Sequence, residues 1–284
     1  MAELQRTIQW IKDANYEAKI VIAGNHDVTL DPEFYAEHGS CFHKKLENSA
    51  KCIDILKREK YEKYTILFLN HESAVVKLTR PEGPRTVFKI FGSPFSRFSG
   101  RWAFRYDTAE EGEHLWSQVP SDADIIVTHT PPFGYCDRHH QDDEKGNTSS
   151  GCKQLLNTLR NIRPILSICG HVHESRGYER IQWDGASSAV SLAKEPLPPI
   201  NSKKQSLIDL TGKKQPSIRN LAGVGAIKGS GDAQLIQKSR QETCIINAAI
   251  LAKSWPHVGG KQFNRPIVVD VNLPVCDEND EAMK

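Results

Sequence analysis

Three short motifs place histidines beside residues that favour tight turns. They read Gly24-Asn25-His26-Asp27, Thr128-His129-Thr130-Pro131-Pro132 and Gly170-His171-Val172-His173. Imidazole nitrogens combined with amide or carboxylate oxygens are the ligands that borderline cations such as manganese, iron and zinc prefer. Glycine in a G-x-H pattern lets the backbone turn tightly, so that both histidine loops reach one centre. These residue types therefore point to a metal site.

Each motif directly follows a segment with the character of a strand. Residues 19–23, 124–128 and 164–169 are short apolar runs, and each run ends where a motif begins. In open α/β sheets, chemistry concentrates in the loops at the carboxyl ends of strands. The position of the three motifs thus favours a functional site over unrelated loops.

The remaining pattern alternates helices and strands. Leu4, Ile8 and Ile11 form one apolar stripe and predict a helix over residues 3–14. Further helices are expected at 44–60 and 152–160, and further strands at 65–69, 74–78, 86–91, 243–249 and 266–272. This alternation is typical of an α/β fold.

Each motif also has a simpler interpretation when taken alone. Gly24-Asn25-His26-Asp27 is compatible with an Asx-type turn, the threonine and proline motif with a rigid loop, and His171 with His173 with two residues on one strand face. The three motifs in order, each after a strand, favour the metal site over three coincidences.

Composition excludes several classes of protein. Hydrophobic residues make up 38% and charged residues 25% of 284 residues, and the formal net charge is +2. No apolar run approaches the roughly 20 residues needed to span a bilayer, and the near-neutral charge gives no specific nucleic-acid surface. The seven cysteines are widely spaced without a C-x-x-C pair, which indicates reduced thiols. We expect a cytoplasmic protein without membrane attachment.

Residues 194–241 differ from the rest of the chain. They mix Pro, Ser, Lys and Gly without sustained periodicity, and carry nine basic but only three acidic side chains. The pattern predicts a disordered basic insertion loop within a single domain that spans 1–284. Contact with an acidic partner is the alternative to a solvated linker.

At the three motifs the sequence resembles the calcineurin-like metallophosphoesterases, whose series is D-x-H, G-D, G-N-H-[DE], a [GT]-H loop and G-H-x-H. The branch it resembles most is the metallophosphoesterase-domain-containing proteins and their fungal relatives, because similar text surrounds the motifs at residues 88–94, at Thr130-Pro131-Pro132 and at Glu174. The resemblance covers about 3–190 and 242–275. It implies a four-layer α/β/β/α fold of two mixed sheets flanked by helices.

The resemblance also implies roles for individual residues. Asn25, His129 and His171 would bind one metal and His173 a second one, from the series Mn, Fe or Zn. His26 would stabilise charge on the phosphate or protonate the leaving oxygen, with Asp27 as an orienting partner. In the family, two cations about 3.5–4 Å apart hold the hydroxide that attacks phosphorus.

One part of the family pattern has no counterpart before Asn25. No D-x-H and no G-D precede it, and the single aspartate in that stretch, Asp13, falls in the predicted helix, where a solvated face is the simpler interpretation. The expectation is an N-terminally incomplete domain that lacks its first strands. Without a bridging carboxylate, such a chain should hold at most one weakly bound cation.

The predicted function is hydrolysis of a phosphodiester or phosphomonoester, on a small phosphate-ester or nucleotide-like substrate. An aromatic and basic cluster comprises Phe95, Phe98, Arg101, Trp102, Phe104 and Arg105. From it, Arg101, Trp102 and Arg105 are candidates for substrate binding, and a hydrophobic loop anchor is the alternative. The rival functions are a truncated, catalytically inactive interaction protein, and a metal-free nucleotide-binding module, which the lack of a glycine-rich phosphate loop disfavours.

Overall fold

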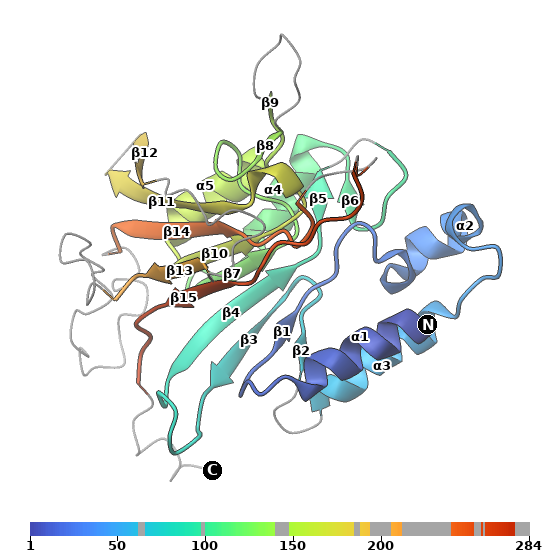
Figure 1. Ribbon diagram of the computed structural model, residues 1–284. Helices are drawn as coiled ribbons and strands as arrows, with labels where there is room; N and C mark the ends of the chain where they lie inside the picture. The colour runs from blue at the N-terminus through green and yellow to red at the C-terminus, as the bar shows by residue number, and fades with distance from the viewer. Residues whose placement is uncertain are drawn as a thin grey trace.

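A seven-stranded mixed sheet forms the centre of the protein in the computed structural model, which describes residues 1–61, 66–97, 100–139, 148–184, 188–193, 206–211, 240–252, 257 and 259–275. Its strand order is β12-β11-β14-β10-β7-β4-β3 (Figure 1). The bounds are β3 (Glu72–Lys77), β4 (Val87–Ser93), β7 (Ile125–Thr128), β10 (Leu166–Cys169), β11 (Gly177–Asp184), β12 (Ser188–Ala193) and β14 (Glu242–Asn247). Strands β4, β7, β10 and β14 run parallel, and antiparallel strands flank them on both sides.

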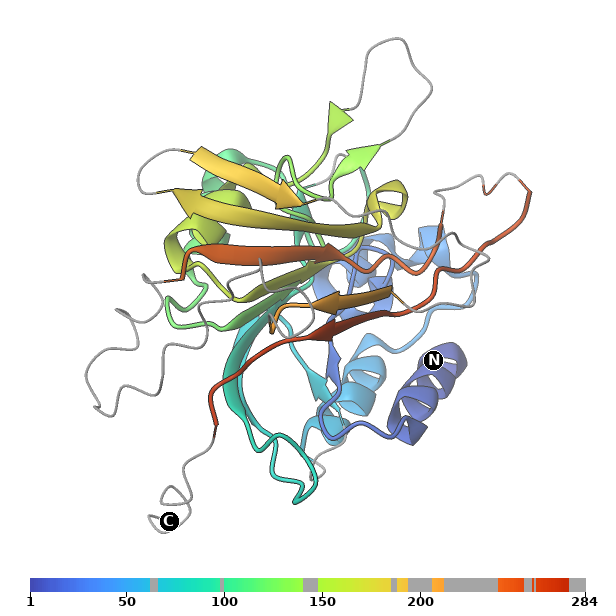
Figure 2. The same cartoon turned by 60° about the vertical axis from the view of Figure 1, so that its left-hand side comes forward.

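Two smaller parallel sheets form a second layer. One pairs β1 (Ile20–Val21) with β2 (Leu67–Phe68), and the other pairs β13 (Ser206–Asp209) with β15 (Ile267–Asp270). A shared apolar core joins them to the large sheet, with Ile208 and Ile20 packed on the cluster that holds Ile90 and Ile246. Figures 1 and 2 show β13 and β15 close to β14.

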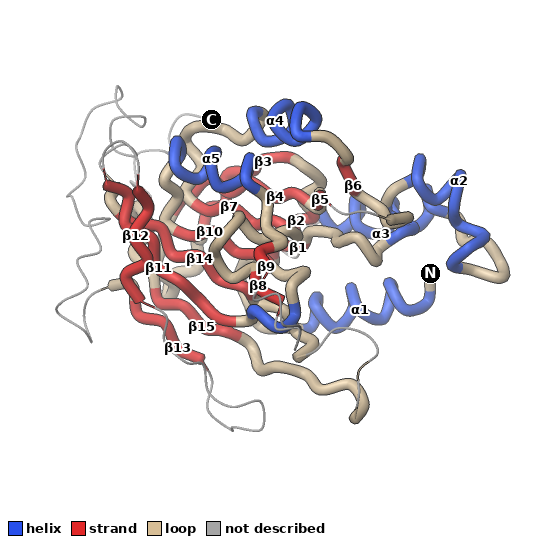
Figure 3. Tube along the Cα trace, turned by 90° about the horizontal axis from the view of Figure 1, so that it is seen from above, coloured by secondary structure: helices blue, strands red, loops and turns tan. Residues whose placement is uncertain are grey.

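Helices cover the outer sides of both layers. Helices α4 (Ala109–Ser117) and α5 (Lys153–Ile162) pack on the large sheet through Trp116, Leu155 and Leu159. Helices α1 (Ala2–Asp13) and α3 (Ser49–Tyr61) pack on the β1–β2 pair. Figure 3 shows α4 and α5 on one side of the strands and α1 on the other. The predicted α/β fold with helix, sheet, sheet and helix layers is confirmed.

Alternation along single strands explains why two cores can form. Ile90 faces the core between the layers, whereas the next residue, Phe91, faces α4 and α5; Ile246 and Ile245 divide in the same way. Successive side chains of a strand point to opposite faces. A strand buried on both sides therefore appears in the sequence as a continuous apolar run.

The remaining elements are short connections and one further helix. Helix α2 (Pro32–Phe42) follows the 3₁₀ helix η1 (Val28–Leu30), and η2 (His173–Ser175) precedes β11. The pairs β5 (Ser96–Arg97) with β6 (Arg105–Tyr106), and β8 (Arg138–His139) with β9 (Thr148–Ser149), complete the list. No helix among the described residues is both long and apolar enough to cross a membrane. All six described cysteines are free thiols.

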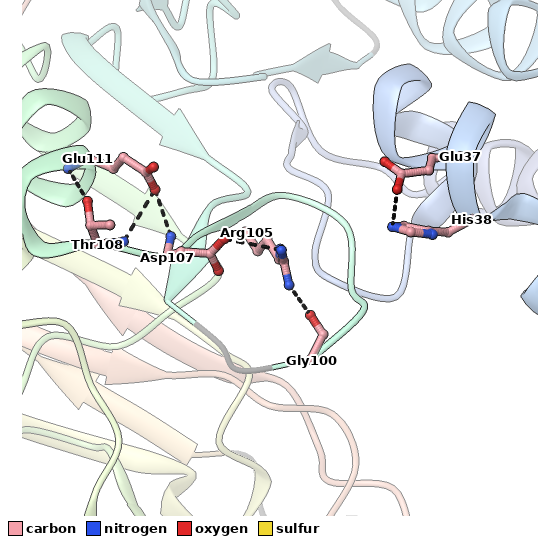
Figure 4. Close-up of polar contacts among 7 residues, drawn as sticks. All are labelled: Glu37, His38, Gly100, Arg105, Asp107, Thr108 and Glu111. Atoms are coloured by element: carbon pink, nitrogen blue, oxygen red, sulfur yellow. Dashed lines mark hydrogen bonds and ion pairs between the residues drawn. The ribbon is translucent and has the colours of Figure 1, made fainter.

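Two helices escaped the prediction although both carry start signals. Asp31 caps α2 by accepting from the backbone N–H of Phe34, with Pro32 at the first helical position. Thr108 and Glu111 form a reciprocal capping box at the start of α4 (Figure 4). The predicted helix at 44–60 is correspondingly displaced, because α3 begins at Ser49 and α2 ends at Phe42.

The predicted insertion loop lies mostly outside the described residues. Within it, residues 206–211 are described and differ from a loop, because Ser206–Asp209 form β13 in register with Ile267–Asp270. Ile208 and Leu210 are only 4% exposed. These two apolar side chains are therefore part of the core. The basic and polar composition of the surrounding segment gave no indication of this.

Candidate metal centre

The second and third histidine motifs lie at adjoining strand ends, joined by a backbone hydrogen bond. The N–H of His129, which follows β7, donates to the carbonyl of Ser93 at the end of β4 over 3.0 Å. The N–H of Gly170, which follows β10, donates to the carbonyl of His129 over 3.2 Å. Parallel neighbouring strands thus deliver both loops to the same edge of the sheet, as expected for a site at a carboxyl edge.

Asn25 reaches this edge from the other layer, at the end of β1. Its side chain is 4% exposed, and its Oδ1 lies 2.7 Å from Nε2 of His129. The rings of His129 and His171 meet edge to face with centroids 4.6 Å apart. The structure therefore brings together an amide oxygen and two imidazoles that are far apart in the sequence.

Burial keeps the His129 imidazole neutral. Removal of the ring from water lowers the pKa of His129 to about 3, and the neighbouring His171, His26 and His173 lower it further because adjacent positive charges repel. A neutral imidazole is the form that binds a cation. The neutral ring keeps one nitrogen lone pair, although Nε2 carries the proton where it donates to the Asn25 Oδ1.

His171 sits in a strained turn. Its φ is 64°, and the N–H of Val172 donates to the carbonyl of Gly170 over 2.7 Å, which closes a three-residue γ-turn around His171. A γ-turn with positive φ is rare, and holding a residue other than glycine in this region costs on the order of 1–3 kcal/mol. The strained residue, His171, is the one whose ring contacts the ring of His129.

His173 begins η2 on the far side of this turn. Its Nδ1 is buried, and the described atoms offer it no hydrogen-bond partner. An orphaned buried nitrogen costs roughly 1–3 kcal/mol. The charge on His173 lowers the pKa of both His26 and His129, so the three rings share one locality.

These donors fit a borderline divalent cation. The amide oxygen of Asn25 and the imidazole nitrogens of His129 and His171 match the preferences of manganese, iron or zinc. Among the described residues, however, no three His, Cys, Asp or Glu side chains gather closely enough to form a metal-binding group of their own. Asp13 accepts a hydrogen bond from Gln9 on α1 and is remote from this set, in agreement with a solvated helix position.

Asp27 holds the first motif in shape. Its Oδ2 accepts from the backbone N–H of Gly24 over 2.7 Å, and its own N–H donates back to the carbonyl of Gly24 over 3.0 Å. The motif is thus a four-residue backbone turn that the Asp27 carboxylate reinforces. It differs from an Asx turn, in which the side chain bonds to the backbone two residues further on. Burial raises the pKa of Asp27, and the Gly24 hydrogen bond opposes this shift.

His26 is exposed and stacks against Trp102. The ring centroids are 4.1 Å apart with a tilt of 52°, and Trp102 in turn contacts Phe42 of α2 at 5.7 Å. Burial of part of the ring lowers the pKa of His26, the carboxylate of Asp27 raises it, and His173 lowers it. A neutral, partly open imidazole beside the metal donors is suited to contact a substrate.

Of the three predicted substrate-binding residues, Trp102 is the one that contacts the site within the described part of the chain, through the ring of His26. Arg101 is exposed. Arg105 is held within its own loop, because Nη1 donates to the carbonyl of Gly100 over 2.6 Å and Nη2 lies 3.1 Å from the Asp107 carboxylate (Figure 4). Phe104 is buried against Phe95, in agreement with a hydrophobic anchor for that part of the cluster.

Asn247, which ends β14 beside the third motif, was not selected from the sequence. Its side chain is fully buried and hydrogen-bonds to the carbonyl of Val172. The available signal was a polar residue directly after the apolar run Cys244–Ile246, inside the strand predicted over 243–249.

Comparison with known proteins identifies the family. The model of the calcineurin-like phosphoesterases matches residues 3–175, and the chain belongs to this family. Metallophosphoesterase domain-containing protein 1 of Homo sapiens is 32% identical over 191 residues, which are 67% of this chain and 54% of that protein. The family predicted from the three motifs is confirmed.

Two further relatives show how the matched region is distributed. A UPF0046 protein of Caenorhabditis elegans is 30% identical over 162 residues, covering 57% of this chain and 48% of that protein. A probable rhamnogalacturonate lyase C of Emericella nidulans is 30% identical over 184 residues, covering 64% of this chain but 15% of that protein. The chain thus spans about half of the human relative and a small part of the fungal one.

Proposed function

We propose that this chain hydrolyses a phosphate ester, either a phosphodiester or a phosphomonoester. The observation that supports this proposal is the convergence of donors from three strand ends, with Asn25 Oδ1 at 2.7 Å from His129 Nε2 and the His129 and His171 rings 4.6 Å apart. Membership of the calcineurin-like phosphoesterases gives the general class of reaction.

Each residue has a separate task in this proposal. Asn25, His129 and His171 hold one divalent cation, and His173 offers its buried nitrogen nearby. Bound divalent cations supply positive charge to phosphate oxygens and make water more acidic. His26, at the exposed end of the set, stabilises charge on the phosphate or protonates the leaving oxygen, while Asp27 fixes the turn that carries it.

We propose one weakly bound cation per chain, although the family as a whole uses two. The proposed ligands Asn25, His129, His171 and His173 include no carboxylate that would bridge two cations, and among the described residues no three His, Cys, Asp or Glu side chains form a metal-binding group. Two like charges at close range repel strongly when nothing between them offsets the repulsion. Titration of the metal-free chain with Mn²⁺, followed by calorimetry, should therefore give a stoichiometry near one, and a stoichiometry of two would contradict this proposal.

Activity is tested by hydrolysis of bis(p-nitrophenyl) phosphate in the presence of Mn²⁺. The substitution His171→Ala removes a ligand, so kcat/KM should fall by at least roughly tenfold to a hundredfold, the range known for residues that merely support metal ligands. His38→Ala on α2 is the matched control, because that ring packs against Phe34 and pairs with Glu37 of the same helix (Figure 4). Full activity in His171→Ala would contradict the proposal that His171 is a metal ligand.

A second candidate function is an inactive interaction protein that retains the fold. The lack of a carboxylate among the four proposed ligands favours it. The two candidates differ in the same assay: the hydrolase requires Mn²⁺-dependent turnover that disappears in His171→Ala, whereas the interaction protein gives background turnover in both.

The substrate that we propose is small and has an aromatic or nucleotide-like part. Trp102 offers a ring face beside His26, and aromatic rings stack on bases without regard to base identity. The organisation as a single domain with residues 194–241 as an insertion, and a cytoplasmic location, remain predictions from the sequence.

A further inference from the structure

The γ-turn around His171 needs support from outside the turn. Residues held at strained φ values persist only where the surrounding structure over-determines them. Two contacts restrain the residues on either side of His171. The N–H of Gly170 donates to the carbonyl of His129, and the side chain of Val172 is fully buried. Neither contacts the carbonyl of Val172, which belongs to the peptide between Val172 and His173 and already accepts from the backbone N–H of Ser175 over 3.2 Å.

Asn247 supplies a further support. Its Nδ2 donates to the carbonyl of Val172 over 2.8 Å and to the carbonyl of Cys136 over 3.0 Å. Its Oδ1 accepts from the N–H of Ala249 over 3.0 Å. Both amide protons are therefore used, and each serves a different loop beside the metal donors.

The second loop is itself built to hold a fixed shape. It follows the His129 motif and contains Cys136, whose φ is 51° and whose N–H donates to the buried carboxylate of Glu179. Asp137 accepts from the N–H groups of Gly134 and Gly151 over 2.8 and 2.9 Å. One amide thus couples the His171 turn to a rigid neighbour.

We infer that Asn247 is a positioning residue for the metal centre, which holds the His171–His173 turn in the conformation that binds a cation. This inference rests on the proposed function, because it assumes that these histidines are ligands. Asn247 touches neither substrate nor metal in this role. It acts through the Val172 carbonyl, as supporting residues around metal ligands generally do.

The test compares Asn247→Ala with Thr243→Val in the metal-free and Zn²⁺-loaded chain. Thr243 is a matched control, since it lies on the same strand, is 1% exposed, and donates from Oγ1 to the carbonyl of Pro164 at the opposite end of the sheet. Both variants lose a buried hydrogen bond to a loop carbonyl. Only the first releases the histidine turn.

Two readouts separate positioning from general stability. Zn²⁺ affinity should fall roughly tenfold to a hundredfold in Asn247→Ala and stay within about twofold in Thr243→Val. In the metal-free chain, the imidazole ¹H–¹⁵N signals of His171 and His173 should shift or broaden in Asn247→Ala and remain in place in Thr243→Val. If Asn247→Ala does not fold, Asn247→Ser replaces it, because one hydroxyl can serve only one of the two carbonyls.

Unchanged ring signals together with unchanged Zn²⁺ affinity in the Asn247 variant would overturn the inference. An equal loss of affinity in Thr243→Val would overturn it as well, because the effect would then follow from stability. If the native chain binds no Zn²⁺, the proposed metal site fails, and the ring signals of the metal-free variants alone decide whether Asn247 positions the turn.

Discussion

Gly24 faces the ring of His129 so closely that no side chain fits between them. A Cβ built on Gly24 would lie 2.7 Å from Cε1 and 2.7 Å from Nδ1 of that ring, and the backbone φ of Gly24 is not in the left-handed region. The glycine is thus required for the approach of the His129 ring, which differs from the tight-turn role that the G-x-H pattern suggested.

The first prediction is that Gly24→Ala weakens cation binding. The new methyl group must displace the His129 ring from Asn25, and overpacking of this kind costs about 1–3 kcal/mol. Gly170→Ala is the matched control, because nothing lies within 4 Å of a Cβ at Gly170. Mn²⁺ titration and thermal unfolding should separate the two variants, and equal behaviour would show that the contact does not matter.

The second prediction concerns β13, within the segment predicted to be a loop. Ile208 is 4% exposed and packs between the layers, so Ile208→Ala should lower the free energy of unfolding by about 2–5 kcal/mol. The control is Val268→Ala on the partner strand β15, where the side chain is 37% exposed and the loss should be far smaller. Urea denaturation measures both. Equal and small losses of unfolding free energy in both variants would mean that Ile208 of β13 does not contribute to the core.

The third prediction is a dependence of stability on pH that originates at His71. Its ring is packed among Phe91, Phe95 and Trp116, with Nδ1 3.0 Å from the hydroxyl of Ser93. Burial lowers the pKa of His71 below its ordinary value of 6.5. Below pH 6.5 the unfolded chain therefore binds the proton more readily than the folded chain.

It follows that the stability contributed by neutral His71 is fully present above pH 6.5 and is lost as the pH falls below it. His71→Asn should flatten the decrease of the unfolding free energy between pH 7 and pH 5, because asparagine does not titrate and tolerates the positive φ of 55°. His38→Asn on α2, whose side chain is 24% exposed, serves as the control. A slope that His71→Asn leaves unaltered would assign the pH dependence to other groups.

The sequence predicted those parts of the protein that depend on local pattern. Ile125–Ile126 and Ile245–Ile246 form continuous apolar runs because both faces of their strands are buried. The loop after the first run was found because it carries the His129 motif. The family motifs then identified Asn25, His129 and His171, which the structure places together.

Contacts between distant segments were beyond the sequence. Nothing in the sequence distinguishes Asn247 from the other asparagines. Only the pairing of β14 with β10 shows that its side-chain amide donates to the Val172 carbonyl. Arg105 was predicted to bind substrate because its positive charge suits a phosphate. The folded loop shows that its guanidinium is instead bound by the Gly100 carbonyl and the Asp107 carboxylate. Packing partners of this kind follow from topology, which no local periodicity encodes.

The fourth prediction distinguishes Trp102 from Arg105 in substrate binding. Trp102→Ala removes the ring that lies 4.1 Å from His26, so both the stacking surface and one restraint on His26 are lost. Stacking of a base on an aromatic side chain is worth about 1–3 kcal/mol by alanine substitution. Because 1.4 kcal/mol corresponds to a tenfold change, KM for an aryl or nucleotide phosphodiester should rise roughly tenfold, and Trp102→Phe should restore most of it.

Arg105→Ala should change KM by less than about twofold, since its guanidinium is bound to Gly100 and Asp107 and exposed ion pairs contribute at most about 1 kcal/mol. The measurement is steady-state hydrolysis of an aryl phosphodiester beside a methyl phosphodiester. Loss of Trp102 should affect the aryl ester through KM, because only that ester has a ring to stack. A larger effect of Arg105→Ala, or equal effects of Trp102→Ala on both esters, would place substrate recognition elsewhere and leave Trp102 as a structural contact of His26.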